Sequence, residues 1–415
     1  MLVQQFFENA KFQSFLNANF IVFRAISQEP EGSAVFKKFS IRATPTVMLL
    51  DPDGSEVDWL VGYGPPPEKF QEQLQKSLDG VETFKVLSAA YAKNPNDVAA
   101  VFKLGVKYGR RYQLDKAAEF YKKVLALDPN GKKGKTDFEG EKVPITQYAE
   151  FNLGYGALTN RPQDAAPMLA FVKKYRTGKI VREAYDRLST YYFLRAAPKE
   201  DAAKFYAEFT GRFPKDAQAL DAWMNRILVD QGPFDLGIEL GQKALGLMAG
   251  TPQPRVTLSL ARIYGSSRDQ AKAMETAELA VKQAKGTDDE QRIVPSAAMI
   301  FVSAGASDKA LALYGPDYAK ANWDSASLLV RYATFWSAQK GANRESALQA
   351  ATRATELQPD LVSAWSALSD LYLAAKNYAE ALKTAEKALE IAAPGRRKEA
   401  IQKKIEQIKK QISEK

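Results

Sequence analysis

The chain of 415 residues contains neither cysteine nor histidine. Without cysteine it has no disulfide and no thiolate nucleophile, and without either residue it has no Cys/His zinc site. No imidazole is available as a general base. Aspartates and glutamates form no cluster with metal-ligand spacing, and Asp-Pro-Asp-Gly at 51–54 has the composition of a turn. We therefore predict no catalytic, cofactor-binding or metal-binding residues and no cofactor.

Long apolar runs are also missing. No stretch of about 18 apolar residues occurs, so we predict no membrane-spanning helix. The formal net charge is +9, and the basic residues are dispersed except near 132–135 and between Arg396 and Lys410. Because no basic stripe alternates with aromatic residues on a strand face, we predict no nucleic-acid binding.

A spacing of 34 residues organises most of the chain. Pro95 and Pro129 lie 34 residues apart, and the unit beginning at Leu328 is followed by one beginning at Val362. Small residues recur where two helices would cross closely, and large ones recur where neighbouring units would meet. The residues that carry the pattern are Leu104, Gly105, Tyr108, Ala117 and Tyr121 in one unit, Tyr264, Ala273, Ala277 and Ala280 in a central unit, and Trp365, Leu368, Tyr372, Ala381 and Ala385 in the last.

This pattern resembles the tetratricopeptide repeat, whose units are pairs of antiparallel helices that bury one another by stacking. The resemblance covers roughly three quarters of the chain and is loose between about 131 and 250. It implies a mainly α fold, with a helical-hairpin solenoid over residues 81–415. We expect residues 128–147 to form a loop inserted between units.

The last predicted helix, residues 396–414, carries isoleucines on one side and lysines on the other. Terminal repeats need a polar outer face, so we predict a helix that caps the solenoid. A coiled-coil seam is the alternative. The isoleucines are Ile401, Ile405, Ile408 and Ile412.

Residues 1–80 do not repeat and are predicted to form a small α/β domain. We expect helices at 2–17, 33–39 and 67–78, a buried strand at 19–26, and an antiparallel hairpin formed by 47–50 and 56–63. Asp53-Gly54 supplies the turn between the two hairpin strands. A further helix at 82–93 keeps the register of the repeats.

The order helix, strand, helix, Thr-Pro, hairpin, helix resembles the later half of the thioredoxin fold. The segment Phe-Ser-Ile-Arg-Ala-Thr-Pro-Thr at 39–46 looks like the family's segment around its cis-proline. The resemblance implies a cis Thr44–Pro45 bond and a client-binding role for Thr44 and Pro45. A purely structural turn is the alternative.

The family's Cys-x-x-Cys motif and the strand before it have no counterpart in this chain. We expect Met1 to be an internal methionine, so that the motif and any signal peptide would be encoded upstream. The alternative is a redox-inactive variant whose sheet is closed differently. Without that strand, the backbone groups of its neighbours would lack partners.

In repeats of this class the first helix of each unit lines a groove, and mixed aromatic and arginine surfaces suit an extended peptide. The candidates are Phe102, Arg110, Arg255, Arg262, Tyr332 and Trp336. We therefore predict a scaffold protein that binds a protein or peptide client and presents it to the thioredoxin-like domain. The alternatives are a truncated thiol–disulfide oxidoreductase, an enzyme with a carboxylate or tyrosine site, and a structural spacer. We expect a bacterial protein and favour the envelope over the cytoplasm; the oligomeric state is left open.

Overall fold

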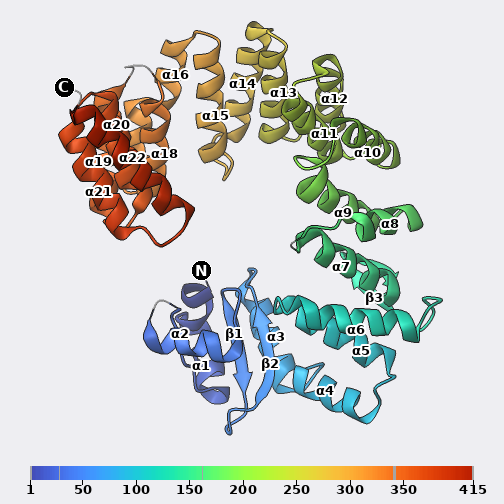
Figure 1. Ribbon diagram of the computed structural model, residues 1–415. Helices are drawn as coiled ribbons and strands as arrows, with labels where there is room; N and C mark the ends of the chain where they lie inside the picture. Colours follow the sequence, from blue (N-terminus) through green and yellow to red (C-terminus); the bar gives the residue numbers. More distant parts are fainter. Residues whose placement is uncertain (1, 28, 161, 340–342, 414–415) are drawn as a thin grey trace. The chain divides into compact units, whose positions relative to one another are not determined.

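The computed structural model of the protein describes all residues except 1, 28, 161, 340–342 and 414–415. The described residues are mainly α-helical and include two short antiparallel sheets (Figure 1). The chain divides into two compact units, Met1–Ala197 and Pro198–Lys415. The predicted domain boundary at residues 80/81 lies inside the first unit and remains a prediction. None of the described helices combines the length and apolar character that crossing a bilayer requires.

The first unit contains a helical turn and three helices around a hairpin, followed by helical pairs. Its elements are η1 (Val3–Phe7), α1 (Ala10–Asn19), α2 (Pro30–Phe39), β1 (Thr46–Leu50), β2 (Glu56–Val61), α3 (Pro67–Leu78), α4 (Phe84–Lys93), α5 (Val98–Arg110), α6 (Leu114–Leu127), β3 (Lys135–Phe138), β4 (Glu141–Pro144), α7 (Ile145–Thr159), α8 (Ala166–Lys174), α9 (Lys179–Leu188) and η2 (Ser189–Phe193).

The amino-terminal hairpin is confirmed. β1 pairs antiparallel with β2, with Thr46 opposite Val61 and Leu49 opposite Asp58. The turn contains Gly54 at a φ of 81°, a left-handed conformation that costs glycine little. One face of the hairpin is buried under η1, α1 and α3 by a cluster of apolar side chains, which are Leu2, Phe6, Phe12, Leu16, Leu49, Phe70 and Leu74.

The buried strand expected at 19–26 is wrong. Residues 20–26 have no regular secondary structure, and the exposed fractions of Ile21 and Phe23 are 103% and 75%. The prediction rested on apolar composition, whereas a strand also needs a partner for its backbone groups. Among the described strands β1 pairs only with β2, so the sheet offers this segment no ladder to join.

A buried charge cluster fastens β2 to α5 within the first unit. Arg111, directly after α5, is 4% exposed and lies 2.6 Å from Glu56. Its guanidinium also lies 3.7 Å from Asp58, whose other oxygen is 2.5 Å from Lys107. The rings of Trp59 and Phe84 lie against the guanidinium carbon, with ring centroids 4.7 and 4.2 Å away. Burial lowers the pKa of Arg111, and the two carboxylates oppose that shift.

The first clear helical pair is α5 and α6. Asp97 caps α5 by accepting hydrogen bonds from the backbone N–H groups of Ala99 and Ala100, which satisfies donors that the helix itself leaves unpaired. The two helices cross closely because Gly105 faces the ring of Tyr121, where an added Cβ would come within 2.9 Å of a ring carbon. The loop expected at 128–147 is wrong in its central part, which is the antiparallel hairpin β3–β4, and α7 begins at Ile145.

The second unit is a succession of helices. They are α10 (Lys199–Arg212), α11 (Ala217–Asp230), α12 (Phe234–Leu247), α13 (Pro254–Ser266), α14 (Gln270–Ala284), α15 (Glu290–Ser303), α16 (Ser307–Tyr314), α17 (Pro316–Ala321), α18 (Ala326–Ser337), α19 (Arg344–Leu357), α20 (Val362–Ala374), α21 (Tyr378–Ile391) and α22 (Arg396–Ser413).

Alanine seams join α13 to α14, α18 to α19 and α20 to α21 in this unit. On α14, Ala273, Ala277 and Ala280 are fully buried in contact with the apolar side of α13. The corresponding residues of α19 and α21 are buried in the same way. A small side chain at these positions permits a close helix crossing, as the 34-residue pattern predicted. The helical-hairpin solenoid expected from the sequence is therefore confirmed.

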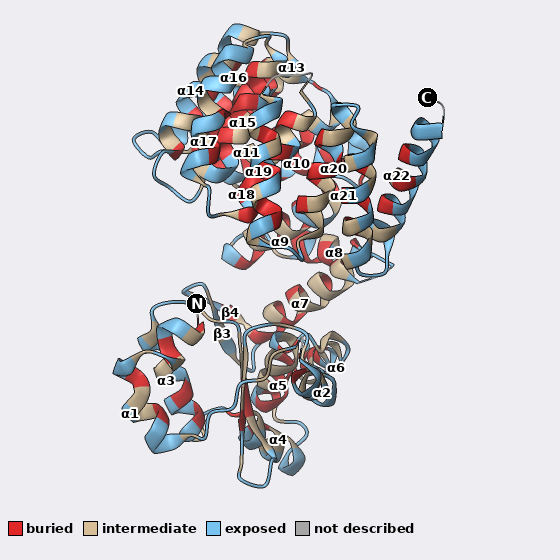
Figure 2. Cartoon of the chain, turned by 90° about the vertical axis from the view of Figure 1, so that its left-hand side faces the viewer, coloured by how far each residue is buried: buried red, intermediate tan, exposed pale blue. Residues whose placement is uncertain are grey.

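The carboxy-terminal helix packs on the last hairpin. Ile401, Ile405 and Ile408 of α22 are buried in a cluster with the alanines of α21 (Figure 2). Ile412 is 43% exposed and lies beyond that contact. The predicted cap is confirmed for the first three isoleucines; residue 414, the last of the predicted helix, lies outside the described residues.

Candidate functional site

The Thr44–Pro45 loop is exposed at the start of β1. The Thr44–Pro45 bond is cis, as the family resemblance implied, and both residues are exposed. The carbonyl of Pro45 accepts a hydrogen bond from the N–H of Gly62 at 2.9 Å. The hydroxyl of Thr46 donates to the carbonyl of Ala43 at 2.8 Å. The loop is thus held at both ends, while a client-binding role for Thr44 and Pro45 remains a prediction.

Three of the six groove candidates are core residues. Phe102 packs edge-to-face on Tyr148, with ring centroids 5.4 Å apart. Tyr332 is fully buried, and its hydroxyl lies 2.9 Å from that of Ser346. The prediction that Phe102, Tyr332 and Trp336 line a groove is therefore corrected, since their side chains are inaccessible to a client.

Trp336 is buried because its polar atom has an internal partner. Its indole N–H donates to the carbonyl of Tyr314 at 2.7 Å, so the whole side chain can leave water at little cost. The wrong prediction for Tyr332 and Trp336 has its cause in the composition of α18. Both Leu329 and Val330 are buried on this helix, so few of its residues face solvent and the sequence pattern did not separate the two sides.

The three arginine candidates are exposed. Arg255 of α13 is held by an ion pair with Asp289, at 2.6 Å. Arg262 lies two turns further along the same helix. Neither Arg110 nor Arg262 has an ion pair in the part of the chain that the structure describes. Arg110 belongs to the first unit, whereas Arg255 and Arg262 belong to the second.

A continuous layer of helices forms the inner face of the second unit. α11 contacts α13, α13 contacts α15, and α15 contacts α18, each being the first helix of its hairpin (Figure 1). Between α15 and α18 this layer is hollowed by an open groove of about 770 Å³. We call it the inner groove, and its lining residues are Asp288, Gln291, Arg292, Pro295, Val330, Arg331, Thr334 and Phe335.

Arg292 and Arg331 give the inner groove its charge. Both are exposed, and neither has an ion pair among the described residues. Sequence reasoning missed them, because they are 39 residues apart and the short helix α17 between them breaks the 34-residue register. Apolar contact surface comes from Pro295 and Phe335, so the groove combines positive charge with an apolar floor.

Asp221 of α11 lies near the arginines. Burial raises the pKa of its carboxyl group, while the neighbouring polar groups of Ser259 and Asn225 and the charges of Arg292 and Arg262 oppose the shift. Its Oδ1 atom is buried and has no hydrogen-bond partner in the described chain. The carboxyl group of Asp221 therefore interacts electrostatically with both Arg262 and Arg292.

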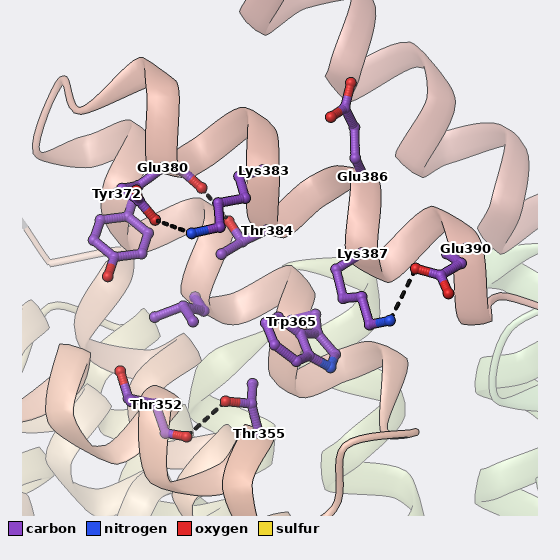
Figure 3. A pocket seen from close by; sticks show the side chains of 11 residues that line it. Thr352, Thr355, Trp365, Tyr372, Glu380, Lys383, Thr384, Glu386, Lys387 and Glu390 are labelled. Carbon is purple, nitrogen blue, oxygen red and sulfur yellow. Dashed lines mark hydrogen bonds and ion pairs between the residues drawn. The ribbon is translucent and has the colours of Figure 1, made fainter.

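A second recess, of about 510 Å³, lies among α19, α20 and α21 (Figure 3). Trp365, Leu368 and Tyr372 of α20 form its apolar surface. The indole N–H of Trp365 donates to the carbonyl of Pro359 at 2.8 Å, which fixes the orientation of the ring. Thr352 and Thr355 of α19 close one side.

The charges of this second recess neutralise one another. Lys387 pairs with Glu390 at 2.9 Å, and Lys383 lies 3.8 Å from Glu380. Glu386 pairs with a lysine of α22. Exposed pairs of this kind contribute roughly 0–1 kcal/mol to stability, but they leave little net charge for a ligand. The inner groove, whose arginines lack such partners, is therefore the better candidate for a binding site.

Metal binding has no support in the described part of the chain, where no three acidic side chains form a group able to hold an ion.

Comparison with known proteins identifies two kinds of domain. A family model for a thioredoxin-like domain matches residues 1–78, and a tetratricopeptide repeat model matches residues 362–394. No curated protein matches the chain.

Solved structures match this chain at low sequence identity. One, described as YrrB, a protein with an unusual peptide-binding site, is 16% identical, and the match covers 45% of this chain and 91% of that one at a TM-score of 0.30. Another, from Parabacteroides merdae, is 15% identical over 74% of this chain and 96% of that one, at a TM-score of 0.37. PilF from Pseudomonas aeruginosa is 14% identical over 55% and 84%, at 0.31. The family models thus find a thioredoxin-like domain at residues 1–78 and one tetratricopeptide repeat at 362–394. Between these two matches the described chain consists mainly of helices.

Proposed function

We propose that this protein is a scaffold whose repeats bind an extended protein or peptide client in the inner groove. The observation that carries the proposal is the open groove of about 770 Å³ between α15 and α18. An extended peptide exposes alternating side chains and backbone groups, and it needs both apolar and polar contacts along its length. Pro295 and Phe335 offer the apolar contacts, and Gln291 and Thr334 offer polar ones.

Selection from a displayed library of random peptides tests this proposal. The full chain is the bait, and the matched variant is Thr334→Trp, which places a large ring in the inner groove at an exposed position. Ala271→Trp, at an exposed position of the outer helix α14, is the control. We expect selected peptides to bind the parent and the control equally and to lose binding to Thr334→Trp. Selected peptides that bind all three proteins alike would refute a client site in the inner groove.

We further propose that a bound client is presented to the thioredoxin-like domain. The exposed Thr44–Pro45 loop supports this role, since its backbone is open to an added segment. Cross-linking tests it, with a photoreactive amino acid placed at Thr44 and a peptide selected in the preceding experiment. Cross-links should form at Thr44 and be absent when the reactive group is placed at Lys69, an exposed residue of α3. Equal yields at both positions would contradict the proposal.

A second candidate function is thiol–disulfide exchange by a longer protein that includes these residues. The exposed apolar segment Ile21–Phe23 favours it, since the family resemblance places a buried strand there. This polypeptide has no thiol, so it should not reduce insulin. A longer protein that carries a Cys-x-x-Cys motif together with these residues should reduce insulin, and its failure to do so would remove this candidate.

A further inference from the structure

Three exposed arginines belong to successive inner helices of the second unit. Arg262 belongs to α13, Arg292 to α15 and Arg331 to α18, and these helices contact one another in that order. All three are exposed, and none has an ion pair among the described residues. Arg292 and Arg331 line the same groove. None of the three has an ion pair with a described carboxylate, although Asp221 lies near Arg262 and Arg292. Arg255 and Arg353, by contrast, pair with aspartate or glutamate side chains.

Such an arrangement has a cost in the free protein. Like charges on neighbouring helices repel one another, and this repulsion is relieved when a ligand supplies negative charge. Guanidinium groups bind carboxylates through paired N–H groups, with geometry that selects planar anions. The groove also has an apolar floor, so its ligand should carry apolar side chains beside its acidic ones.

We infer that the inner groove recognises acidic segments of an extended polypeptide. Arg292 and Arg331 hold aspartate or glutamate side chains of the client, and Pro295 and Phe335 contact apolar side chains that lie beside them. Arg262 extends the positive row towards α11. The inference rests on the proposed function and adds to it the chemistry of the client.

A nucleic acid fits these observations less well. Two carboxylates accompany the arginines: Asp288 lines the groove, and Asp221 lies beside Arg262 and Arg292. A phosphate backbone carries continuous charge and needs a continuous basic track, together with aromatic faces for its bases. A peptide can place its few carboxylates at the arginines and leave neutral residues opposite the aspartates.

The library selection is repeated with two proteins of equal net charge. One is the double variant Arg292→Gln/Arg331→Gln, and the other is Lys282→Gln/Lys285→Gln, which removes two exposed lysines at the end of α14. Peptides selected on the parent and on the lysine variant should be enriched in aspartate and glutamate relative to the input library. Peptides selected on the arginine variant should lose this enrichment.

Fluorescence anisotropy then measures how strongly one selected peptide binds the parent and the arginine variant. Its counterpart, with each acidic residue replaced by the corresponding amide, should bind the parent about tenfold more weakly or worse, because hydrogen bonds to charged groups are the strong ones. The arginine variant should bind the acidic peptide with a similar loss. The arginine variant should bind the acidic peptide and the amide peptide with similar affinity, since it lacks the two guanidinium groups that bind carboxylates.

The outcomes separate the inference from the proposed function. Peptides that are sensitive to Thr334→Trp but show no acidic enrichment would overturn the inference and leave a client site in the groove. No peptide sensitive to Thr334→Trp would overturn both. The inference would be overturned in favour of a nucleic acid if no acidic peptide bound the parent, while a single-stranded RNA oligonucleotide bound it and lost affinity in Arg292→Gln/Arg331→Gln.

Discussion

Arg111→Met tests how the amino-terminal domain is fastened to the first repeat. Arg111 directly follows α5 and lies 2.6 Å from Glu56 of β2, against the rings of Trp59 and Phe84. Methionine has a similar length and keeps the space between the rings filled. The substitution therefore removes the charge while it leaves most of the packing.

The expected cost follows from what remains of the cluster. Removing one partner of a buried ion pair costs about 3–5 kcal/mol, because the other charge is left without compensation. Here Asp58 keeps Lys107 at 2.5 Å, and the side chain of Glu56 is 26% exposed, so water relieves part of the loss. The thioether can also contact the two rings favourably. Because of these compensations, we expect a loss of stability at the lower end of that range, about 3 kcal/mol.

Hydrogen exchange followed by mass spectrometry measures this loss where it occurs. Peptides that cover β2 and α5 report the free energy of opening each element. In Arg111→Met we expect β2 to open more easily by about 3 kcal/mol, with exchange in the second unit unchanged.

Arg110→Met is the matched control, because Arg110 is the exposed neighbour and has no ion pair in the described chain. Its effect should stay within about 0.5 kcal/mol. Equal exchange of β2 in the two variants would refute the idea that the buried charges hold the domain to the repeat.

Three further predictions concern the pH dependence, the weakest segment and the alanine seams. Because burial raises the pKa of Asp221, the unfolded state ionises first, and stability falls as pH rises from the unfolded pKa towards the folded one. Asp221→Asn should therefore raise Tm in calorimetry at about pH 7 and change it little at about pH 3; equal shifts at both would contradict this. Chymotrypsin should cut first after Phe23, because this residue lies in an exposed segment, and mass spectrometry of the early fragments would identify the site. First cuts within the repeats would contradict this prediction. Ala277→Leu should lower the free energy of unfolding in urea by about 1–3 kcal/mol, because the position is fully buried. Glu275→Leu, on the exposed side of α14, should not lower it, and equal losses in the two variants would contradict a tightly packed alanine seam.

The helical repeats were predictable because their determinants are local and periodic. Ala273 and Ala277 recur at the spacing that a helix crossing requires, and Asp97 marks the start of α5. The hairpin β1–β2 was predictable for the same reason, since Asp53 and Gly54 supply its turn. These features depend on nearby residues, so the sequence carries them directly.

The misses depend on contacts between distant residues. The sequence at 19–26 is as apolar as a buried strand, but burial required a partner that this sheet does not offer. Tyr332 and Trp336 are residue types that are common on binding surfaces. Both are buried here, because Tyr332 has a hydrogen-bond partner on α19 and Trp336 has one on α16. Arg292 and Arg331 come together only because α17 is inserted between their hairpins. Irregular spacing of this kind hides a site from a search for a fixed period.

The alanine seams also determine how the second unit responds to force. An alanine side chain has no χ rotamers, so the α14 side of the contact with α13 cannot yield by rotation of side chains. Contacts between successive hairpins use longer side chains such as Leu240 and Ile263, which can change rotamer as the helices slide. Elastic compliance should therefore reside between hairpins, with each hairpin behaving as a stiff block. A molecule stretched by its ends would lengthen by small rotations of these blocks before any hairpin opened.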